Sequence, residues 1–196
     1  MKKTYKLEHT DIFPTVDGLH ISQTMIALEN FKKIIPSFDV IIEIGYYRGG
    51  LTQWFAINKK PNARIIAYDI TDTHRNSQGF DFDPEIEFIA SDCFSENGVK
   101  NIKELLKSEG SVLLFCDGGD KIKEFNFFSE YLKPKDVIMV HDYYDDTLDE
   151  PYALDLNWPS PYETTYSSIQ QSIKKNKLKK YKYQDFRKSL IGSFIK

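Results

Sequence analysis

Five short hydrophobic runs recur along the chain, and segments with a different pattern separate them. The runs cover residues 39–44, 63–70, 85–90, 111–117 and 136–142. They are nearly continuous, whereas a strand with one face in water alternates apolar and polar residues. Continuous runs of this length predict strands that are covered on both faces of a parallel sheet.

The segments between the runs carry apolar residues at three- and four-residue spacing, which is the helical period. This pattern occupies residues 50–60, 98–110 and 121–134. Gly110 and Pro134 end the last two segments, and both residue types commonly stop helices. Alternation of strands and helices predicts an α/β fold with a parallel sheet and right-handed crossovers.

The two ends of the chain have other patterns. Residues 21–35 predict an amphipathic helix that packs on the sheet, and residues 163–175 predict another helix after a polar, aromatic loop. The last two segments, 178–186 and 189–196, alternate around a short polar turn. They predict a terminal antiparallel hairpin.

Length and composition bound the organisation. The chain has 196 residues, of which 41% are hydrophobic and 28% charged, as in an ordinary globular protein with one sizeable core. No linker-like tract divides it. We therefore expect a single domain over residues 1–196, and its expected parts are a helical cap (1–36), a cofactor-binding core (37–142) and a substrate-side segment (143–196).

Several classes of protein are disfavoured. No apolar stretch approaches the 18 or so residues of a membrane-spanning helix, and the first lysines precede no apolar core of a signal peptide. Cys93 and Cys116 share no metal-type spacing. We expect a reduced, cytoplasmic setting and no membrane partner.

Charge is uneven along the chain. The net charge of -3 gives no general attraction to nucleic acid, yet residues 174–183 hold six lysines and residues 141–150 five acids. Two interpretations stay open for each. The lysines contact RNA phosphates or form a solvated face. The acids favour a cationic substrate or a metal, or they belong to a solvated loop.

The stretch "VIIEIGYYRGGLTQWFA", residues 40–56, carries the strongest functional signal. Its strand contains Glu43 near the carboxyl end, and a buried acid is costly without partners. Gly45, Gly49 and Gly50 follow, and glycine lets the backbone adopt positive φ and approach a ligand closely. The helix that begins there offers free N–H groups to an anion. This stretch predicts a pocket for a nucleoside-like molecule with an anionic or zwitterionic part.

Two common nucleotide sites are disfavoured by the spacing. The glycines read G-x-x-x-G-G, with Tyr47 where the second glycine of a dinucleotide motif stands. No G-K-[ST] follows, so a P-loop is also disfavoured.

The arrangement E-x-G-x-x-x-G, with Asp69 ending the second strand and Asp92 following the third, resembles class I S-adenosylmethionine-dependent methyltransferases over residues 35–196. "EIGYYRGGLT" resembles the first motif of catechol O-methyltransferase-like enzymes. "FCDGGDK" and "YLKPKDVIMVHDY" resemble the pattern of sugar and natural-product (macrocin-type) O-methyltransferases. The resemblance implies a Rossmann-like three-layer α/β/α sandwich whose mostly parallel seven-stranded sheet ends in an antiparallel strand.

The resemblance also implies which residues bind S-adenosylmethionine. Glu43 and Gly45 line its methionine and ribose side, Asp69 accepts hydrogen bonds from the ribose hydroxyls, and Asp92 lies at the adenine. Arg48 either pairs with the cofactor carboxylate or faces solvent. The implied cofactor-binding set is Glu43, Gly45, Tyr47, Gly49, Asp69, Ser91, Asp92 and Asp117.

The implied catalytic set is Asp117, Lys121, His141 and Asp142. Asp117 and Asp142 end neighbouring strands, so their carboxylates are expected to converge. Two mechanisms stay open: the two acids hold Mg²⁺ as metal ligands, or His141 or Lys121 is the general base. The chain departs from the pattern at Tyr143, where metal-dependent relatives have an asparagine, and at Lys121, which stands near the position of a histidine. Structural roles compete as well, since Asp117 caps a turn or His141 is satisfied at a strand end.

The function implied is O-methylation of a small hydroxylated acceptor, such as a sugar or natural-product moiety. Trp158, Tyr162 and Tyr166 either form an aromatic lid over such an acceptor or cover the edge of the sheet. Two alternatives remain: an RNA methyltransferase, disfavoured because the fourth strand ends in "CDGG" and lacks an Asn/Asp-Pro-Pro-Tyr motif, and a non-catalytic cofactor-binding protein of the same fold. A homodimer stays open, since many relatives dimerise.

Overall fold

The computed structural model of the chain describes residues 6–8, 13–108, 110–148 and 163–196. Its centre is a seven-stranded sheet with the strand order β11-β12-β8-β7-β4-β5-β6. Five of these strands are parallel and correspond to the five predicted runs: β4 (Val40–Ile44), β5 (Arg64–Asp69), β6 (Ile86–Ala90), β7 (Val112–Cys116) and β8 (Val137–Val140). The Rossmann-like fold and its seven-stranded, mostly parallel sheet are confirmed.

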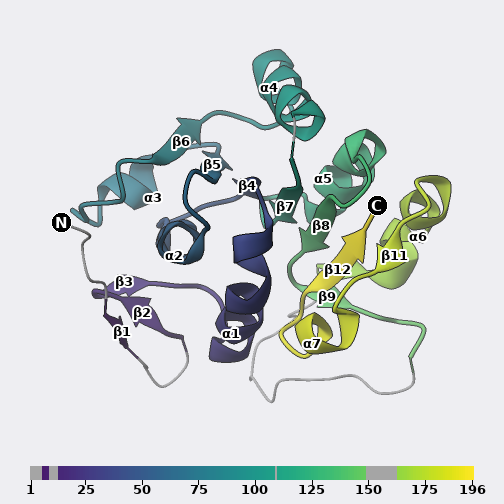
Figure 1. Cartoon of the computed structure of the whole chain (residues 1–196), viewed down its shortest axis with the longest axis horizontal. Helices are drawn as coiled ribbons and strands as arrows, with labels where there is room; N and C mark the ends of the chain where they lie inside the picture. Colours follow the sequence, from purple (N-terminus) through teal and green to yellow (C-terminus); the bar gives the residue numbers. More distant parts are fainter. Residues whose placement is uncertain (1–5, 9–12, 109, 149–162) are drawn as a thin grey trace.

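Helices cover both faces of the sheet, which confirms the three layers (Figure 1). One face packs against α1 (Met25–Ile34), α2 (Gly50–Asn58) and α7 (Tyr183–Arg187). The other packs against α4 (Glu96–Lys107), α5 (Lys121–Phe128) and α6 (Tyr166–Lys175). Short helical turns complete the set, namely η1 (Ile35–Ser37), α3 (Thr73–Asn76) and η2 (Ser129–Tyr131). None of the described helices combines the length and the apolar character needed to cross a membrane.

The segment before the sheet contains more than the expected helix. Three two-residue strands, β1 (Leu7–Glu8), β2 (Thr15–Val16) and β3 (Leu19–His20), form a small antiparallel sheet. Helix α1 then begins at Met25, because the Thr24 side chain accepts a hydrogen bond from the Ala27 N–H and caps it. The 1–36 segment thus holds a helix and a small sheet, which lies beside α2 in Figure 1.

The terminal hairpin is only partly as predicted. The strand β12 (Gly192–Ile195) runs antiparallel to β8, as expected. The strand β11 (Lys179–Lys180) pairs with β12, also antiparallel. The prediction of a strand over 178–186 is wrong beyond Lys180. Lys182 adopts a left-handed conformation (φ 46°), and α7 follows, with Phe186 fully buried against Phe31 of α1. Tertiary packing of this aromatic residue overrides the alternating pattern.

Two further short strands lie beyond the carboxyl end of β8. β9 (Tyr143–Tyr144) pairs in parallel with β10 (Thr164–Thr165). The Tyr143 and Tyr183 hydroxyls are 2.6 Å apart, and both side chains are buried. The pairing of β9 with β10 places the start of the 163–196 segment next to the end of β8.

Phe31 provides a test of the packing between α1 and the sheet. Its fully buried ring meets those of Phe55, Phe115 and Phe186 at centroid distances of 5.1, 5.5 and 5.1 Å. Phe31→Ala is expected to lower the free energy of unfolding by about 3–5 kcal/mol, because lost burial adds to an unfilled cavity. Urea unfolding measures this change. Ile26→Ala, on the same helix but 48% exposed, is the control, and equal losses for the two variants would contradict the assignment.

Candidate active site

The register of three neighbouring parallel strands brings the candidate residues together. Ile44 of β4 pairs with Cys116 of β7, which in turn pairs with Val140 of β8. The next residues therefore leave the sheet at one edge. The Asp117 N–H donates to the Ile44 carbonyl (2.9 Å), and the His141 N–H donates to the Cys116 carbonyl (3.1 Å). This edge is where open α/β sheets bind ligands.

The turn between β4 and α2 needs its glycines for packing. Gly45 has φ 89°, and a Cβ there would lie 2.2 Å from the Asp117 carbonyl oxygen. Gly49 has φ 81°, and its Cβ would lie 2.8 Å from the Phe82 ring. Tyr47 also has positive φ (47°). The turn therefore lies tight against the end of β7, and α2 begins directly after it.

A cavity of about 550 Å³ opens at this edge, a size that suits a small molecule. The glycine turn, the ends of β7 and β8, and segments from both ends of the chain surround it. The lining residues are Phe13, His20, Ser22, Gln23, Thr24, Glu43, Gly45, Tyr46, Tyr47, Arg48, Gly50, Leu51, Asp117, His141, Asp142, Glu163, Ser189 and Leu190.

Glu43 is a buried acid with one hydroxyl partner. Glu43 is 2% exposed, and the Thr52 hydroxyl donates a hydrogen bond to its Oε2 at 2.5 Å. Burial raises the pKa of Glu43 to about 8, and the bond from Thr52 offsets only part of this effect. The carboxyl group is therefore mainly neutral at pH 7.

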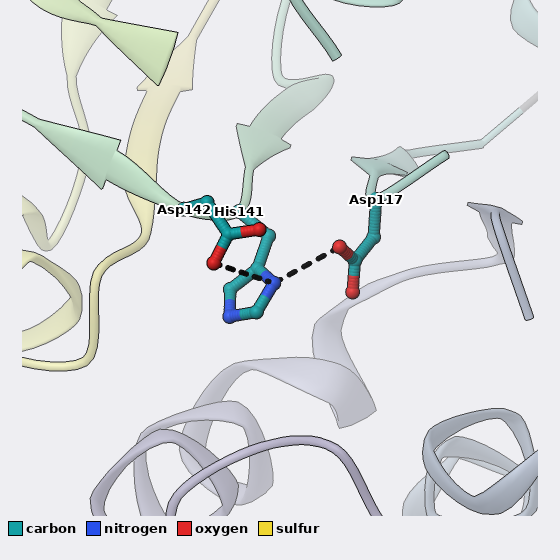
Figure 2. A group of neighbouring side chains, drawn as sticks. All are labelled: Asp117, His141 and Asp142. Carbon is teal, nitrogen blue, oxygen red and sulfur yellow. Dashed lines mark hydrogen bonds and ion pairs between the residues drawn. The ribbon is translucent and has the colours of Figure 1, made fainter. Parts of the chain in front are cut away.

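Asp117, His141 and Asp142 form a cluster at the mouth of β7 and β8 (Figure 2). His141 Nδ1 lies 2.9 Å from Asp117 Oδ1 and 3.6 Å from Asp142 Oδ1. Because a carboxylate only accepts hydrogen bonds, Nδ1 carries the proton, and Nε2 is the unprotonated nitrogen of the neutral ring. Gln23 Nε2 donates to the other oxygen of Asp117 (3.3 Å). Burial by itself lowers the pKa of His141. The charge of Asp117 and the hydrogen bond to it outweigh the effect of burial, so the pKa of His141 lies above its ordinary value.

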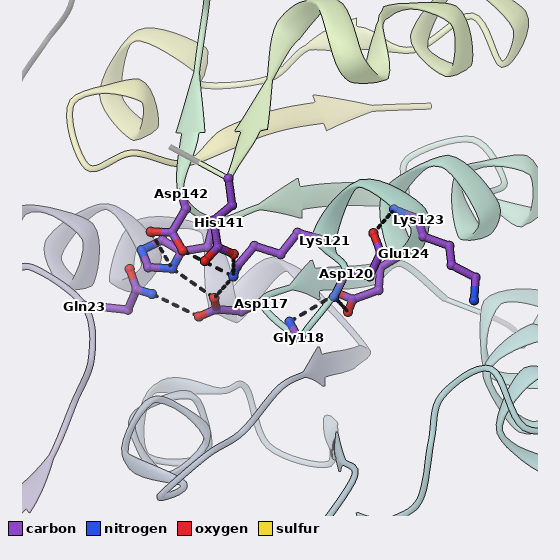
Figure 3. A network of polar contacts seen from close by, with 10 residues as sticks. Gln23, Asp117, Gly118, Asp120, Lys121, Lys123, Glu124, His141 and Asp142 are labelled. Carbon is purple, nitrogen blue, oxygen red and sulfur yellow. Dashed lines mark hydrogen bonds and ion pairs between the residues drawn. The ribbon is translucent and has the colours of Figure 1, made fainter. Parts of the chain in front are cut away.

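Lys121, the first residue of α5, reaches across the same edge (Figure 3). It is 8% exposed, and its ammonium lies 2.5 Å from Glu163 Oε2, 3.2 Å from Asp142 Oδ2 and 3.8 Å from Asp117 Oδ1. Burial lowers the pKa of Lys121, but the hydrogen bond to Glu163 and the three negative charges outweigh it, so the pKa is raised. A group held in its charged form has no lone pair with which to accept a proton.

The remaining residues of the implied cofactor set, Gly49, Asp69, Ser91 and Asp92, are not among the residues that line the cavity. Asp69 ends β5, and Ser91 and Asp92 follow β6. Asp69 Oδ2 accepts from the Tyr47 N–H (2.8 Å), and the Ser91 N–H donates to the Asp69 carbonyl (2.7 Å). Asp92 is exposed, and its Oδ1 accepts from the Phe94 N–H (2.8 Å). Asp69, Ser91 and Asp92 lie together, while Glu43, Gly45, Tyr47 and Asp117 line the cavity.

Two cavity residues, Gln23 and Glu163, had no signal in the sequence. Gln23 precedes α1 and meets Asp117 across 94 positions of the chain. Glu163 meets Lys121 across 42 positions. Only the packing of the chain ends on the sheet edge brings them there.

The other sequence signals have local explanations in the described residues. Lys175 and Lys180 of the lysine-rich segment pair with Glu130 and Asp145. Asp145 of the acidic segment is itself buried, so this part of the segment is structural. Of the aromatic lid, Trp158 and Tyr162 lie outside the described residues, and Tyr166 begins α6.

Residues 25–145, more than half of the chain, match the model of the family described as FtsJ-like methyltransferase. The chain belongs to the FtsJ-like methyltransferase family. This match confirms the predicted class, a methyltransferase. Among curated proteins, none matches at a significant level.

Solved structures share the fold of this methyltransferase. Human N-acetylserotonin methyltransferase in complex with SAM has a TM-score of 0.55 at 17% identity over 86% of this chain and 49% of its own. The apo structure of CmcI-N160 has a TM-score of 0.62 at 13% identity, with 91% and 74% covered. An O-methyltransferase from Bacillus cereus in complex with SAH has a TM-score of 0.50 at 14% identity, with 91% and 84% covered. The chain thus spans about half the length of the human enzyme.

The buried acid Glu43 generates a prediction about pH. In the folded methyltransferase it keeps its proton up to about pH 8, whereas an unfolded chain loses it near pH 4.5. The folded state then binds more protons, so this group's contribution to stability is full below pH 4.5 and is lost as the pH rises toward 8. As the pH rises from 5 to 8, the free energy of unfolding of Glu43→Gln is expected to increase by about 3 kcal/mol relative to that of wild type, since one pKa unit is about 1.4 kcal/mol.

Urea unfolding at pH 5, 6.5 and 8 measures this difference. Glu104→Gln, an exposed acid on α4, is the control and is expected to follow wild type. Parallel pH profiles for Glu43→Gln and wild type would show that Glu43 is ionised in the folded protein.

Proposed function

We propose that this chain is an S-adenosylmethionine-dependent O-methyltransferase that acts on a small hydroxylated molecule, such as a sugar or natural-product moiety. The observation that carries the proposal is the Asp117–His141 pair at the wall of the cavity, next to the glycine turn. The family assigns methyl transfer, and this pair supplies the proton acceptor that a hydroxyl nucleophile needs.

The residues beside the turn fit a zwitterionic nucleoside. Helix α2 begins at Gly50, which lines the cavity, and the free N–H groups of a helix N-terminus favour a carboxylate. Arg48 lines the cavity, and its buried Nε has no hydrogen-bond partner among the described residues. Asp69 has acceptor capacity beyond its bond from Tyr47, which suits ribose hydroxyls. When bound, S-adenosylmethionine supplies an activated methyl group, so the protein has to position the acceptor and manage its proton.

His141 is the proposed general base. In the neutral form of His141, Asp117 holds the proton of Nδ1, which leaves Nε2 with a lone pair to take the proton of the acceptor hydroxyl. Gln23 binds the second oxygen of Asp117 and fixes the orientation of the carboxylate. Lys121, which three carboxylates keep charged, is the weaker candidate for this role.

The walls of the cavity support a small acceptor with hydroxyl groups. Phe13 and Tyr46 provide aromatic surface, and Ser22 and Thr24 provide hydroxyl groups. Such a mixture binds the apolar face and the hydroxyls of a sugar or an aromatic natural product. The support for RNA is limited to the exposed lysines of residues 174–183, of which Lys175 and Lys180 have acidic partners.

Calorimetric titration with S-adenosylhomocysteine tests the cofactor. We expect micromolar affinity for the wild type and a loss of at least about tenfold for Asp69→Ala, roughly 1.4 kcal/mol, because a ribose contact disappears. Glu104→Ala, remote on α4, is the control. Absence of binding to the wild-type protein would remove the proposed function, and unchanged affinity in Asp69→Ala would remove the assignment of Asp69.

His141→Gln tests the proposed base. Methyl transfer to a panel of hydroxylated sugars and phenols is expected to fall by about 10²–10⁴-fold, because the hydroxyl proton then has no acceptor. The affinity for S-adenosylhomocysteine is expected to stay unchanged. Full activity of this variant would exclude His141 as the base, and cofactor binding without any transfer by the wild type would favour a non-catalytic protein.

A further inference from the structure

The acids at the edge of the sheet already have a cation. Lys121 is buried, and its ammonium faces Asp117, Asp142 and Glu163, which come from the end of β7, the end of β8 and the residue before β10. Figure 3 shows the side chain reaching from the start of α5 into this group of acids. A single fixed positive charge thus lies among three carboxylates.

Two of these acids, Asp117 and Asp142, also belong to the set that would hold a divalent ion. Ligand atoms of Asp117, His141 and Asp142 lie within 4.8 Å of one another. However, Asp117 Oδ1 is bound to His141 Nδ1, and Asp142 Oδ2 faces the Lys121 ammonium at 3.2 Å. Magnesium prefers oxygen ligands at about 2.0–2.1 Å, and a histidine nitrogen is a poor member of such a set.

A metal ion at this place would also meet a positive charge of the protein. An ion bound to the inward oxygens of Asp117 and Asp142 would be close to the ammonium that lies 3.8 and 3.2 Å from them. Repulsion between like charges is strong in a partly buried site. The acids and Lys121 therefore do not fit a divalent ion as they stand.

We propose that the Lys121 ammonium takes the place of a divalent cation at this edge, so that the methyl transfer proposed above, on which this inference rests, proceeds without a metal. Lys121 is a positioning residue. It keeps its proton throughout, balances Asp117 and Asp142, and so fixes the carboxylate that orients His141.

Binding of Mn²⁺, followed by the electron paramagnetic resonance signal of the free ion, tests the proposal without any acceptor. We expect no stoichiometric site in the wild-type protein. Lys121→Met removes the charge and retains much of the bulk. This variant is expected to bind one Mn²⁺, with a dissociation constant at least about ten times lower than that of any weak, non-stoichiometric binding to wild type. The added Asp117→Asn substitution is expected to abolish this binding.

Two variants separate the charge of Lys121 from its bulk and its helix. Lys121→Arg restores a cation and is expected to remain without a Mn²⁺ site. Lys123→Met is the matched control on the same helix: Lys123 is exposed, lies over the Phe94 ring at 3.8 Å and points away from the acids in Figure 3. It is expected to behave as wild type.

The wild-type titration decides the matter even where a variant fails to fold. One Mn²⁺ per wild-type chain that is lost in Asp117→Asn would overturn the proposal, as would a folded Lys121→Met that binds no ion. Loss of wild-type methyl transfer in EDTA, regained with Mg²⁺, would overturn it as well. Failure of the proposed function is distinguished by a different measurement, because the wild-type protein would then not bind S-adenosylhomocysteine.

Discussion

The parallel register of β4, β7 and β8 is the constraint on which the site depends. Ile44, Cys116 and Val140 lie in one row across the sheet, so the chain leaves all three strands at the same height. Gly45 allows the turn after β4 to contact the backbone of Asp117, where any side chain would collide. A shift of one residue would turn Asp117 to the other face of the sheet, and His141 would lose its partner.

Charge balance at this edge follows from that geometry. Three acids converge because their strands and segments end there, and their mutual repulsion needs compensation. Lys121 and His141 provide it by direct contact, with Lys121 within 4 Å of all three acids and His141 within 4 Å of Asp117 and Asp142. Glu43, deeper in the sheet, is handled differently: it keeps its proton, because burial without a cationic partner raises its pKa to about 8. The same edge thus carries charged acids near solvent and a neutral acid beneath them.

The sequence predicted those features that depend on neighbouring residues. Continuous apolar runs located the five parallel strands, and acids at the ends of two of them located Asp117 and Asp142, because strand ends in a parallel sheet must share an edge. The alternating pattern after residue 178 was misleading, since burial of Phe186 against α1 favours a helix. Gln23 and Glu163 were out of reach for a physical reason: each contact joins residues more than 40 positions apart and depends on how the chain ends dock. The roles of the site residues and the domain boundaries remain predictions.

Residues inside and outside the family match both line the cavity. The family match spans residues 25–145, which include the glycine turn and the Asp117–His141 pair. Phe13, His20 and Gln23 on one side, and Glu163 and Ser189 on the other, line the cavity but lie outside the matched residues. The matched residues therefore include the sheet edge with Asp117 and His141, whereas part of the cavity wall comes from the two ends of the chain. Glu163 joins the two parts, because it lines the cavity and also binds Lys121. Under the proposed mechanism, an acceptor that displaces Glu163 would change the charge balance around His141, so acceptor binding and proton transfer would be coupled at this residue.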